Sequence, residues 1–303
     1  TEGKTKKSIE VKLIEGLNNS KFMNNFTSKA YAKVNSALNV TGKKTKLHKI
    51  ESLISFIDLH DLINLKQINK NDHKVVFKGK FSKNISKTNT VTNLLKLLDK
   101  KNLLNDQKFE IKIYKNIPQE AGMGGGSMNA ASLINFFIKQ KMFKIKKNEL
   151  TKLTSQIGSD VILGIKPINT ILYNNGDIKK YNKSIKFHTL VVKPSFGCST
   201  KYIYSKVKIF SKPQFNFPQS KMFEAKYLKT FKNDLENIAF KKHPKLKKIK
   251  LFLSNMPNNI FARMSGSGSS IVAYFESKRA CGNAYTQFKR KFSSHWCIIS
   301  KTI

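Results

Sequence analysis

The chain has 303 residues, of which 40% are hydrophobic, and this length suits one large domain or two ordinary ones, of which we favour two. No stretch approaches the ~18 consecutive apolar residues of a membrane helix, and no secretory signal pattern opens the chain, so we expect a cytoplasmic protein with no membrane partner. Three widely spaced cysteines and six histidines without an HExxH or Cys/His cluster exclude a disulfide framework and argue against a bound transition metal. Any metal is expected to arrive with a nucleotide.

The charge is strongly positive, with 57 Lys and Arg against 18 Asp and Glu, a formal net charge of +39. Such a field attracts nucleic acid, anionic membranes or phosphorylated substrates. Almost all of this charge is lysine spread along the whole chain, together with abundant Asn, Ile and Phe, so the codon bias of an A/T-rich genome explains it as well. Because there is no RNP, zinc-finger or arginine-rich motif, we expect no specific nucleic-acid partner, only a nonspecific affinity for polyanions.

Residues 1–23 are polar and Lys-rich, and we interpret them as an N-terminal extension that is either disordered or not native, with Met23 as an alternative start. A transit peptide is a second interpretation, which the acidic residues and the lack of arginine weaken.

Strand and helix patterns alternate after this extension. Residues 32–40 alternate apolar and polar side chains, residues 41–44 supply a turn, and residues 50–59 are apolar enough for another buried element. Residues 90–98 space their apolar side chains as one face of a helix, and residues 109–113 alternate as a strand. The pattern predicts mixed helix and sheet.

The most informative segment is residues 117–137, IPQEAGMGGGSMNAASLINFF, in which we expect a strand to run through a glycine-rich turn into a helix. Apolar positions at Ala130, Leu133, Ile134 and Phe137 have the spacing of one helical face. Clustered glycines let backbone N–H groups converge on one anion, and the helix adds the positive end of its dipole. The sequence therefore predicts a polyphosphate site, with a tight structural turn as the alternative.

This segment resembles the PxxxGLGGGSSNAA signature of the GHMP kinases, and three glycines followed by Ser-x-Asn resemble the branch that phosphorylates 4-diphosphocytidyl-2-C-methyl-D-erythritol. Four more segments resemble that branch in order and spacing, over about residues 29 to 300. They are AKVN at 32–35, GSDV at 158–161, NDLE at 233–236 and MSGSGSSIVA at 264–273.

The resemblance implies an α+β, two-domain GHMP kinase fold, with a ribosomal S5-like N-terminal domain at residues 24–165, a ferredoxin-like C-terminal domain at residues 166–303 and the active site in the interdomain cleft. It implies transfer of the γ-phosphate of ATP, with Mg²⁺, to the 2-hydroxyl of a cytidyl diphosphate sugar alcohol in the non-mevalonate isoprenoid pathway. We expect a monomer or a homodimer.

The resemblance also assigns site residues. Asp160 and Lys33 are the catalytic candidates, and we leave open whether Asp160 takes the hydroxyl proton or Lys33 acts mainly by polarising the hydroxyl. Ser127 is the candidate for contact with Mg²⁺, and Arg263 is a possible further source of positive charge. The expected ATP-binding residues are Pro118, Gly122, Gly124, Gly125, Gly126, Ser127 and Asn129. The expected substrate-binding residues are His48, Tyr204, Asn35, Gly266, Ser267 and Gly268.

The sequence departs from the family at three places. Leu47 stands where an aromatic residue usually precedes the histidine, which weakens the expected recognition of cytosine, while Met128 and residues 161–163 change packing. Two alternatives therefore stay open: a different GHMP kinase acting on homoserine, mevalonate or a sugar, and a non-catalytic polyanion-binding relative.

Overall fold

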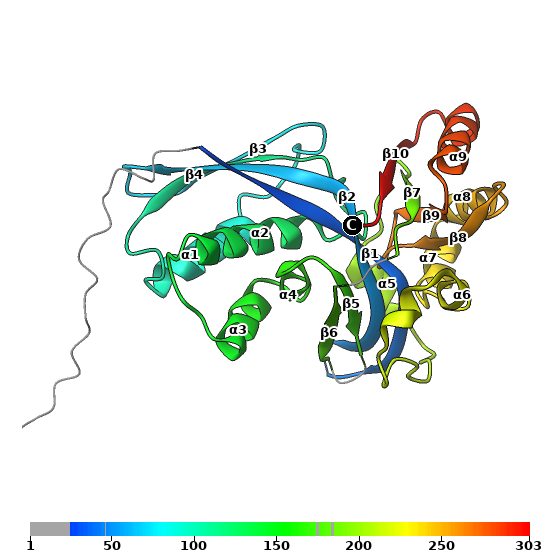
Figure 1. Ribbon diagram of the computed structural model, residues 1–303, viewed down its shortest axis with the longest axis horizontal. Helices are drawn as coiled ribbons and strands as arrows, with labels where there is room; N and C mark the ends of the chain where they lie inside the picture. Colours follow the sequence, from blue (N-terminus) through cyan, green and yellow to red (C-terminus); the bar gives the residue numbers. More distant parts are fainter. Residues whose placement is uncertain (1–24, 46, 174–175, 183–184) are drawn as a thin grey trace, which may run out of the picture.

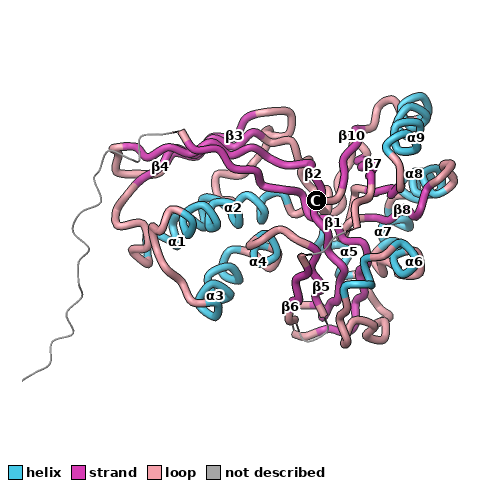
Figure 2. The backbone as a smooth tube through the Cα atoms, viewed as in Figure 1, coloured by secondary structure: helices cyan, strands magenta, loops and turns pink. Residues whose placement is uncertain are grey.

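The computed structural model describes residues 25–45, 47–173, 176–182 and 185–303 (Figure 1). The expected extension at residues 1–23 lies outside these ranges. Two sheets, each with its own helices, lie side by side, and the long strands β1 and β2 run from one towards the other (Figures 1 and 2). Within the described part of the chain, no helix has the length and hydropathy of a membrane span.

The larger sheet has six strands in the order β3-β4-β2-β5-β6, with β1 paired to β2. The strand predicted at residues 32–40 is confirmed within β1. The buried element predicted at residues 50–59 is confirmed as part of the first half of β2, and the two strands form an antiparallel pair. The strand predicted at residues 109–113 is confirmed within β4. The strands are β1 (Phe26–Lys43), β2 (His48–Ile68), β3 (Lys74–Lys78), β4 (Lys108–Tyr114), β5 (Asn169–Leu172) and β6 (Ile178–Tyr181).

Helices cover one face of this sheet (Figure 1). They are α1 (Thr90–Lys100), α2 (Gly125–Lys139), α3 (Lys147–Ile157) and α4 (Val161–Gly164). The predicted apolar face of α2 is confirmed, since all four of its predicted positions are buried in the core. The strand does not run directly into the glycines, however, because residues 115–124 form a loop after β4. Asp61 binds the start of that loop, a constraint that periodicity does not reveal.

The smaller sheet has four antiparallel strands in the order β10-β7-β9-β8. Helices follow β7 and β9, which gives the βαββαβ order of the ferredoxin-like fold that the resemblance implied. The strands are β7 (His188–Lys193), β8 (Asn259–Met264), β9 (Ile271–Phe275) and β10 (Trp296–Lys301). The helices are α5 (Thr200–Ser205), a 3₁₀ turn η1 (Ser220–Phe223), α6 (Ala225–Leu228), α7 (Glu236–Lys242), α8 (Pro244–Ser254) and α9 (Lys278–Lys291).

The two sheets share a buried apolar cluster and several backbone contacts. Leu38 near the end of β1 forms a bridge with Asn233, and Ile57 of β2 forms one with Thr302 after β10. Strands β5 and β6 follow residue 165 in the chain but belong to the larger sheet. The domain boundary at residue 165 stays a prediction, and the larger sheet extends past it.

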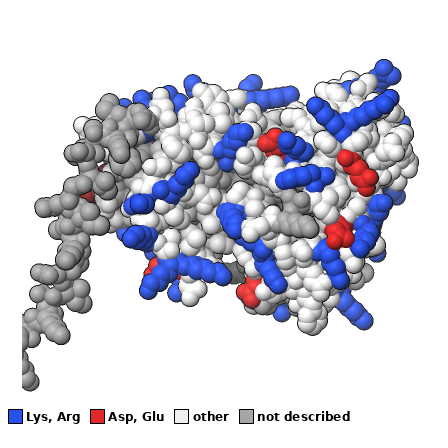
Figure 3. All heavy atoms as spheres, in the orientation of Figure 1, with Lys and Arg blue, Asp and Glu red and all other residues white. Residues whose placement is uncertain are grey.

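The basic side chains are scattered over the face of the molecule that Figure 3 shows, from one sheet to the other, with a few acidic side chains among them. A dedicated nucleic-acid surface would concentrate basic side chains in one patch or stripe. On this face the basic side chains are instead spread out, as the lysines are along the sequence.

Candidate active site

A cavity of about 1060 Å³ lies where the two sheets meet. It is lined by segments from β1, β2, the glycine-rich loop, α2, the turn before α4, α5 and the loop between β8 and β9. Every residue that the sequence singled out for catalysis, ATP or substrate lines it except Gly268, whose role stays a prediction. The residues brought together are Lys33, Asn35, His48, Pro118, Gly122, Gly124, Gly125, Gly126, Ser127, Asn129, Asp160, Tyr204, Gly266 and Ser267.

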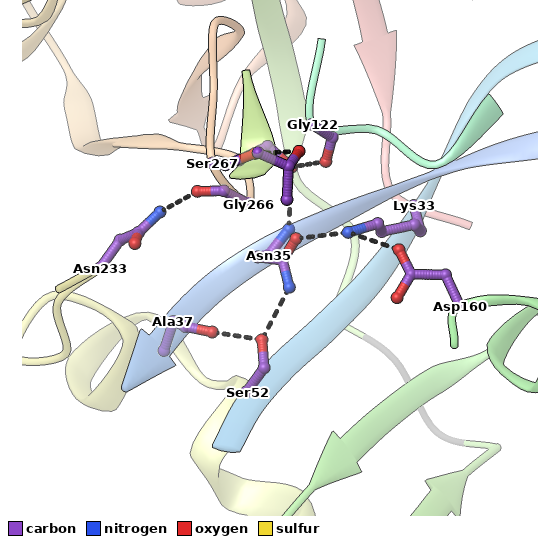
Figure 4. A network of polar contacts seen from close by, with 11 residues as sticks. Lys33, Asn35, Ala37, Ser52, Gly122, Asp160, Asn233, Gly266 and Ser267 are labelled. Carbon is purple, nitrogen blue, oxygen red and sulfur yellow. Dashed lines mark hydrogen bonds and ion pairs between the residues drawn. The ribbon is translucent and has the colours of Figure 1, made fainter. Parts of the chain in front are cut away.

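Lys33 and Asp160 form an ion pair at the wall of this cavity, with 3.3 Å between Nζ and Oδ2 (Figure 4). The side chain of Lys33 is 7% exposed, whereas that of Asp160 is 36% exposed. The ammonium is therefore enclosed and held in place, while the carboxylate has free surface towards the cavity. A group that is ionised, positioned and still accessible is what a reacting hydroxyl requires.

Asn35 fixes the position of Lys33. Alternate residues of a strand share a face, so the two side chains on β1 point the same way, and the Lys33 ammonium donates a 2.8 Å hydrogen bond to Asn35 Oδ1 (Figure 4). The Asn35 amide donates in turn to Ser52 Oγ on β2, at 2.8 Å, and Ser52 donates to the carbonyl of Ala37. This buried chain orients the amide, because only the oxygen of Asn35 can accept from an ammonium.

Helix α4 positions the backbone of Asp160, and Lys33 is the ion-pair partner of its side chain. Asp160 precedes α4 as the N-cap residue but makes no side-chain capping bond, which leaves its carboxylate available. Helix α4 itself is fixed from two sides: Asn135 of α2 donates to Gly164 O at 3.1 Å, and the Lys180 ammonium donates to the carbonyls of Leu163, Ile165 and Lys166. Burial lowers the pKa of Lys180 to about 8, with a smaller effect of Lys166.

The glycine-rich loop passes closer to its neighbours than a side chain would permit. A Cβ on Gly122 would lie 2.0 Å from the carbonyl oxygen of Ser265, and one on Gly124 would lie 3.1 Å from Lys33 Cε. Both residues have positive φ, at 72° and 66°, which glycine adopts without strain. Helix α2 begins directly afterwards, and its first residues line the cavity together with Lys33. The first N–H groups of a helix have no intrahelical acceptor, so they are the donors available at this end of α2.

A second glycine turn, at residues 265–269 between β8 and β9, meets the first. Ser265 donates from its hydroxyl to Gly122 O at 2.9 Å, which joins the two turns directly. Asn233 donates to the carbonyls of Met264 and Gly266, each at 2.8 Å, and Glu236 accepts from the amide of Met264. The NDLE segment thus supports this turn from behind.

His48 and Tyr204 lie together in the lining of the cavity, with ring centroids 5.2 Å apart. Burial raises the pKa of Tyr204, with Asp160 as a second cause, and burial together with Lys43 lowers the pKa of His48. The imidazole is therefore neutral at neutral pH and can both donate and accept. Leu47 also lines the cavity, and its side chain is 74% exposed. Because leucine is aliphatic, this position offers no ring for stacking.

Comparison with known proteins identifies the family. Residues 89–167 match the GHMP kinases N terminal domain. The chain is 67% identical over 281 residues to the 4-diphosphocytidyl-2-C-methyl-D-erythritol kinase of Pelagibacter ubique, covering 93% of this chain and 100% of that one. The chain belongs to the 4-diphosphocytidyl-2-C-methyl-D-erythritol kinase family. The kinase of that name from Clostridium kluyveri is 33% identical over 91% of this chain and 99% of its own length.

Solved structures of GHMP kinases have the same fold. A crystal structure of 4-(cytidine 5'-diphospho)-2C-methyl-D-erythritol kinase aligns with a TM-score of 0.74 at 21% identity, covering 92% of this chain and 100% of that one. The homoserine kinase from Cytophaga hutchinsonii aligns with a TM-score of 0.69 at 15% identity, covering 95% and 97%. The α+β GHMP kinase fold is therefore confirmed.

One prediction about this family member is wrong. Arg263 does not supply charge to the cavity, because its guanidinium is buried and donates to the carbonyls of Ser36 and Leu228. It also lies 4.9 Å from the centroid of the Phe261 ring. A buried guanidinium is accommodated where several carbonyls accept from it, so Arg263 fastens β1 to β8.

Two groups that the sequence reasoning missed also line the cavity. Lys115 is buried in an ion pair with Asp61, and the same carboxylate accepts 2.8 Å hydrogen bonds from the amides of Asn116 and Ile117. Thr90, at the start of α1, donates to Gly126 O at 2.8 Å. Sequence alone does not distinguish the buried Lys115 from the many surface lysines.

Proposed function

We propose that this chain transfers the γ-phosphoryl group of ATP to the 2-hydroxyl of 4-diphosphocytidyl-2-C-methyl-D-erythritol, a step towards isoprenoid precursors. The observation that carries the proposal is the Lys33–Asp160 pair set directly beneath the glycine-rich turn, in one cavity with His48 and Tyr204. The match to relatives of that name supports the choice of substrate.

Asp160 acts on the acceptor. Its carboxylate accepts the hydrogen bond of the 2-hydroxyl and takes the proton as the oxygen bonds to the γ-phosphorus, while ADP leaves. Lys33 holds Asp160 in place and sets a positive charge where negative charge develops on the transferring group. Asn35 keeps the lysine ammonium aimed at this point.

The residues at the start of α2 fit a triphosphate. The close backbone approach at Gly124 leaves a cradle that a Cβ would fill, and the buried oxygen Oδ1 of Asn129 has no hydrogen-bond partner among the described residues. Ser127 presents its hydroxyl to the same space. The described residues contain no cluster of three or more His, Cys, Asp or Glu, so Mg²⁺ is expected as the ATP complex, with Ser127 as its contact. When bound with ATP, Mg²⁺ would supply positive charge beside the phosphate oxygens.

His48 and Tyr204 are the proposed recognition elements for the cytosine end of the substrate. A neutral imidazole offers one donor and one acceptor to a base edge, and the tyrosine ring supplies a stacking face. With Leu47 in place of an aromatic, only one face of the base would be stacked. We therefore expect weaker binding of the cytidyl group than in relatives that carry an aromatic there.

The substrate proposal is tested by an acceptor panel. Purified protein with Mg·ATP is assayed for ADP release with the cytidyl alcohol, homoserine and mevalonate. The highest kcat/KM is expected for the cytidyl alcohol. A preference for either of the other alcohols would refute the substrate assignment, and no ADP release with any acceptor would favour the non-catalytic alternative.

The catalytic assignment is tested by Asp160→Asn and Lys33→Ala, each expected to lower kcat by at least ~100-fold with the fold intact. The matched control is the exposed pair of Glu224 and Lys226, which has the same 3.3 Å separation but does not line the cavity. Glu224→Gln and Lys226→Ala should leave kcat unchanged. A near-normal kcat in Asp160→Asn would exclude that carboxylate as the group that receives the proton.

A further inference from the structure

A second cavity, of about 620 Å³, lies beside residues 118 and 119, which lead into the glycine-rich turn. Its walls come from both sheets: the residues after β3, the end of β7, the last turns of α9 and the start of β10. The volume falls in the range of small-molecule sites, roughly 300 to 1,000 Å³. None of the residues assigned to catalysis or to the cytidyl group lines it.

The charge of this cavity has one sign. Lys80, Lys193 and Lys289 line it, and no Asp or Glu does. Among the described residues, none of these three ammonium groups has a carboxylate within ion-pair distance. Burial lowers the pKa of Lys193, and the negative charge of Glu120 opposes this shift. Lysines that lack a carboxylate partner inside a concavity attract anions, and phosphate oxygens above all.

Two of these lysines are held in place by backbone carbonyls. Lys193 donates to the carbonyls of Pro194 and Phe196, each at 3.1 Å, and Lys289 donates to His295 O at 3.1 Å. Each ammonium has three donors, so both keep donors for a ligand. Restrained lysines lose less side-chain entropy on binding than free ones.

The same cavity has an aromatic wall. Phe81 and Trp296 meet edge to face, with centroids 5.6 Å apart, and Tyr285 completes the apolar part. Lys80 lies 5.7 Å from the centre of the Phe81 ring. An apolar wall beside a group of cations matches a molecule that carries a phosphate at one end and an apolar or planar group at the other.

The cavity also touches the proposed ATP site. Pro118 and Gln119 line both cavities, and the Gln119 amide donates to the carbonyls of Phe81 and Lys83 at 3.0 and 2.7 Å. Gln119 therefore ties the aromatic wall to the segment that becomes the glycine turn at Gly122. A ligand here would contact the two residues that hold the start of that segment.

We propose that this second cavity binds a phosphorylated small molecule with an apolar or aromatic group, and that its occupancy changes the affinity of the glycine-rich turn for ATP. The coupling rests on the proposed kinase function, whereas the binding does not. The probe is phenyl phosphate. Inorganic phosphate and phenol, which carry only its phosphate or only its ring, are the comparison compounds.

Trp296 is the single tryptophan of the chain and lies in this cavity and not in the first one, so its fluorescence reports binding here. Phenyl phosphate should give a saturable change at lower concentration than inorganic phosphate, and phenol should give none. The double variant Lys80→Met/Lys289→Met should weaken the phenyl phosphate titration by at least ~10-fold. Lys80 is exposed, so the single variant Lys80→Met keeps the fold and should show part of the loss.

The matched control is Lys291→Met, on the same helix but outside the cavity. An equal loss in that control, or a signal that never saturates, would mean nonspecific attraction to a basic protein and would overturn the proposal. Equal affinity for phosphate and phenyl phosphate would overturn the aromatic part. At saturating probe the KM for ATP should change in the wild type and not in the double variant, and an unchanged KM would overturn the coupling.

Discussion

Alanine at Gly122 should disturb both glycine turns at once. The new Cβ would lie 2.0 Å from the carbonyl oxygen of Ser265, and that oxygen already accepts from the amide of Gly268 at 2.9 Å, so it cannot move without opening the second turn. A non-glycine residue at a φ of 72° costs about 1–2 kcal/mol, and forcing an atom into a packed contact costs about 1–3 kcal/mol more. The free energy of unfolding should therefore fall by about 2–5 kcal/mol.

Gly176→Ala separates the two contributions, because Gly176 has a φ of 92° but, its chain neighbours aside, no atom of the described residues lies within 4 Å of the position that a Cβ would occupy. Urea unfolding of the wild type and both variants gives the comparison, and kcat/KM for the cytidyl alcohol gives the effect on the site. Gly176→Ala should lose only the conformational part, about 1–2 kcal/mol. If Gly122→Ala is no less stable than Gly176→Ala, the contact between the turns is not the constraint that we infer.

Three further changes follow from the same structure. Asp61→Asn removes the partner of the buried Lys115 ammonium and should lower the free energy of unfolding by about 3–5 kcal/mol in urea titrations; an unchanged midpoint would contradict the pair's role. Gly282→Ala, inside α9 with no described residue beyond its own helix backbone within 4 Å of the new Cβ, should raise the free energy of unfolding by about 0.4–1 kcal/mol; a lower value would mean a contact that the structure does not contain. His48 has its pKa lowered by burial and by Lys43, so the unfolded chain binds the proton first as pH falls, and stability decreases below about pH 6.5. The KM for the cytidyl alcohol should be constant near neutral pH and change only below about pH 6.5. In a His48→Asn variant this change at low pH should be absent.

Much of this site was accessible from sequence because its residues fall in short continuous motifs. Glycines before a helix predict a phosphate cradle from backbone geometry alone, and the amphipathic spacing of α2 is visible in its letters. The pairing of Lys33 with Asp160 required the family resemblance, because neither residue is conspicuous among 57 basic and 18 acidic side chains. The structure brings them to 3.3 Å, as that resemblance implied.

The remaining features depend on contacts between distant segments. The Asp61–Lys115 pair joins β2 to the loop after β4, and nothing in local spacing indicates that either residue is buried. The wrong prediction for Arg263 has the same origin: its place beside a glycine motif suggested the active site, whereas its side chain on β8 reaches the carbonyls of Ser36 in β1 and Leu228 in α6. Which face a strand residue occupies depends on register, and register is a property of the pair of strands.

The way that β2 collects partners has a practical consequence for anyone who wishes to divide or recombine this chain. Its pairing with β5, which lies after residue 165, and its bridge to the C-terminal Thr302 mean that a cut at residue 165 leaves the first fragment with an open sheet edge. Chimaeras with other members of the family should therefore exchange the segment after β6, so that each parent contributes a complete sheet and β2 keeps its pairing with β1, β4 and β5.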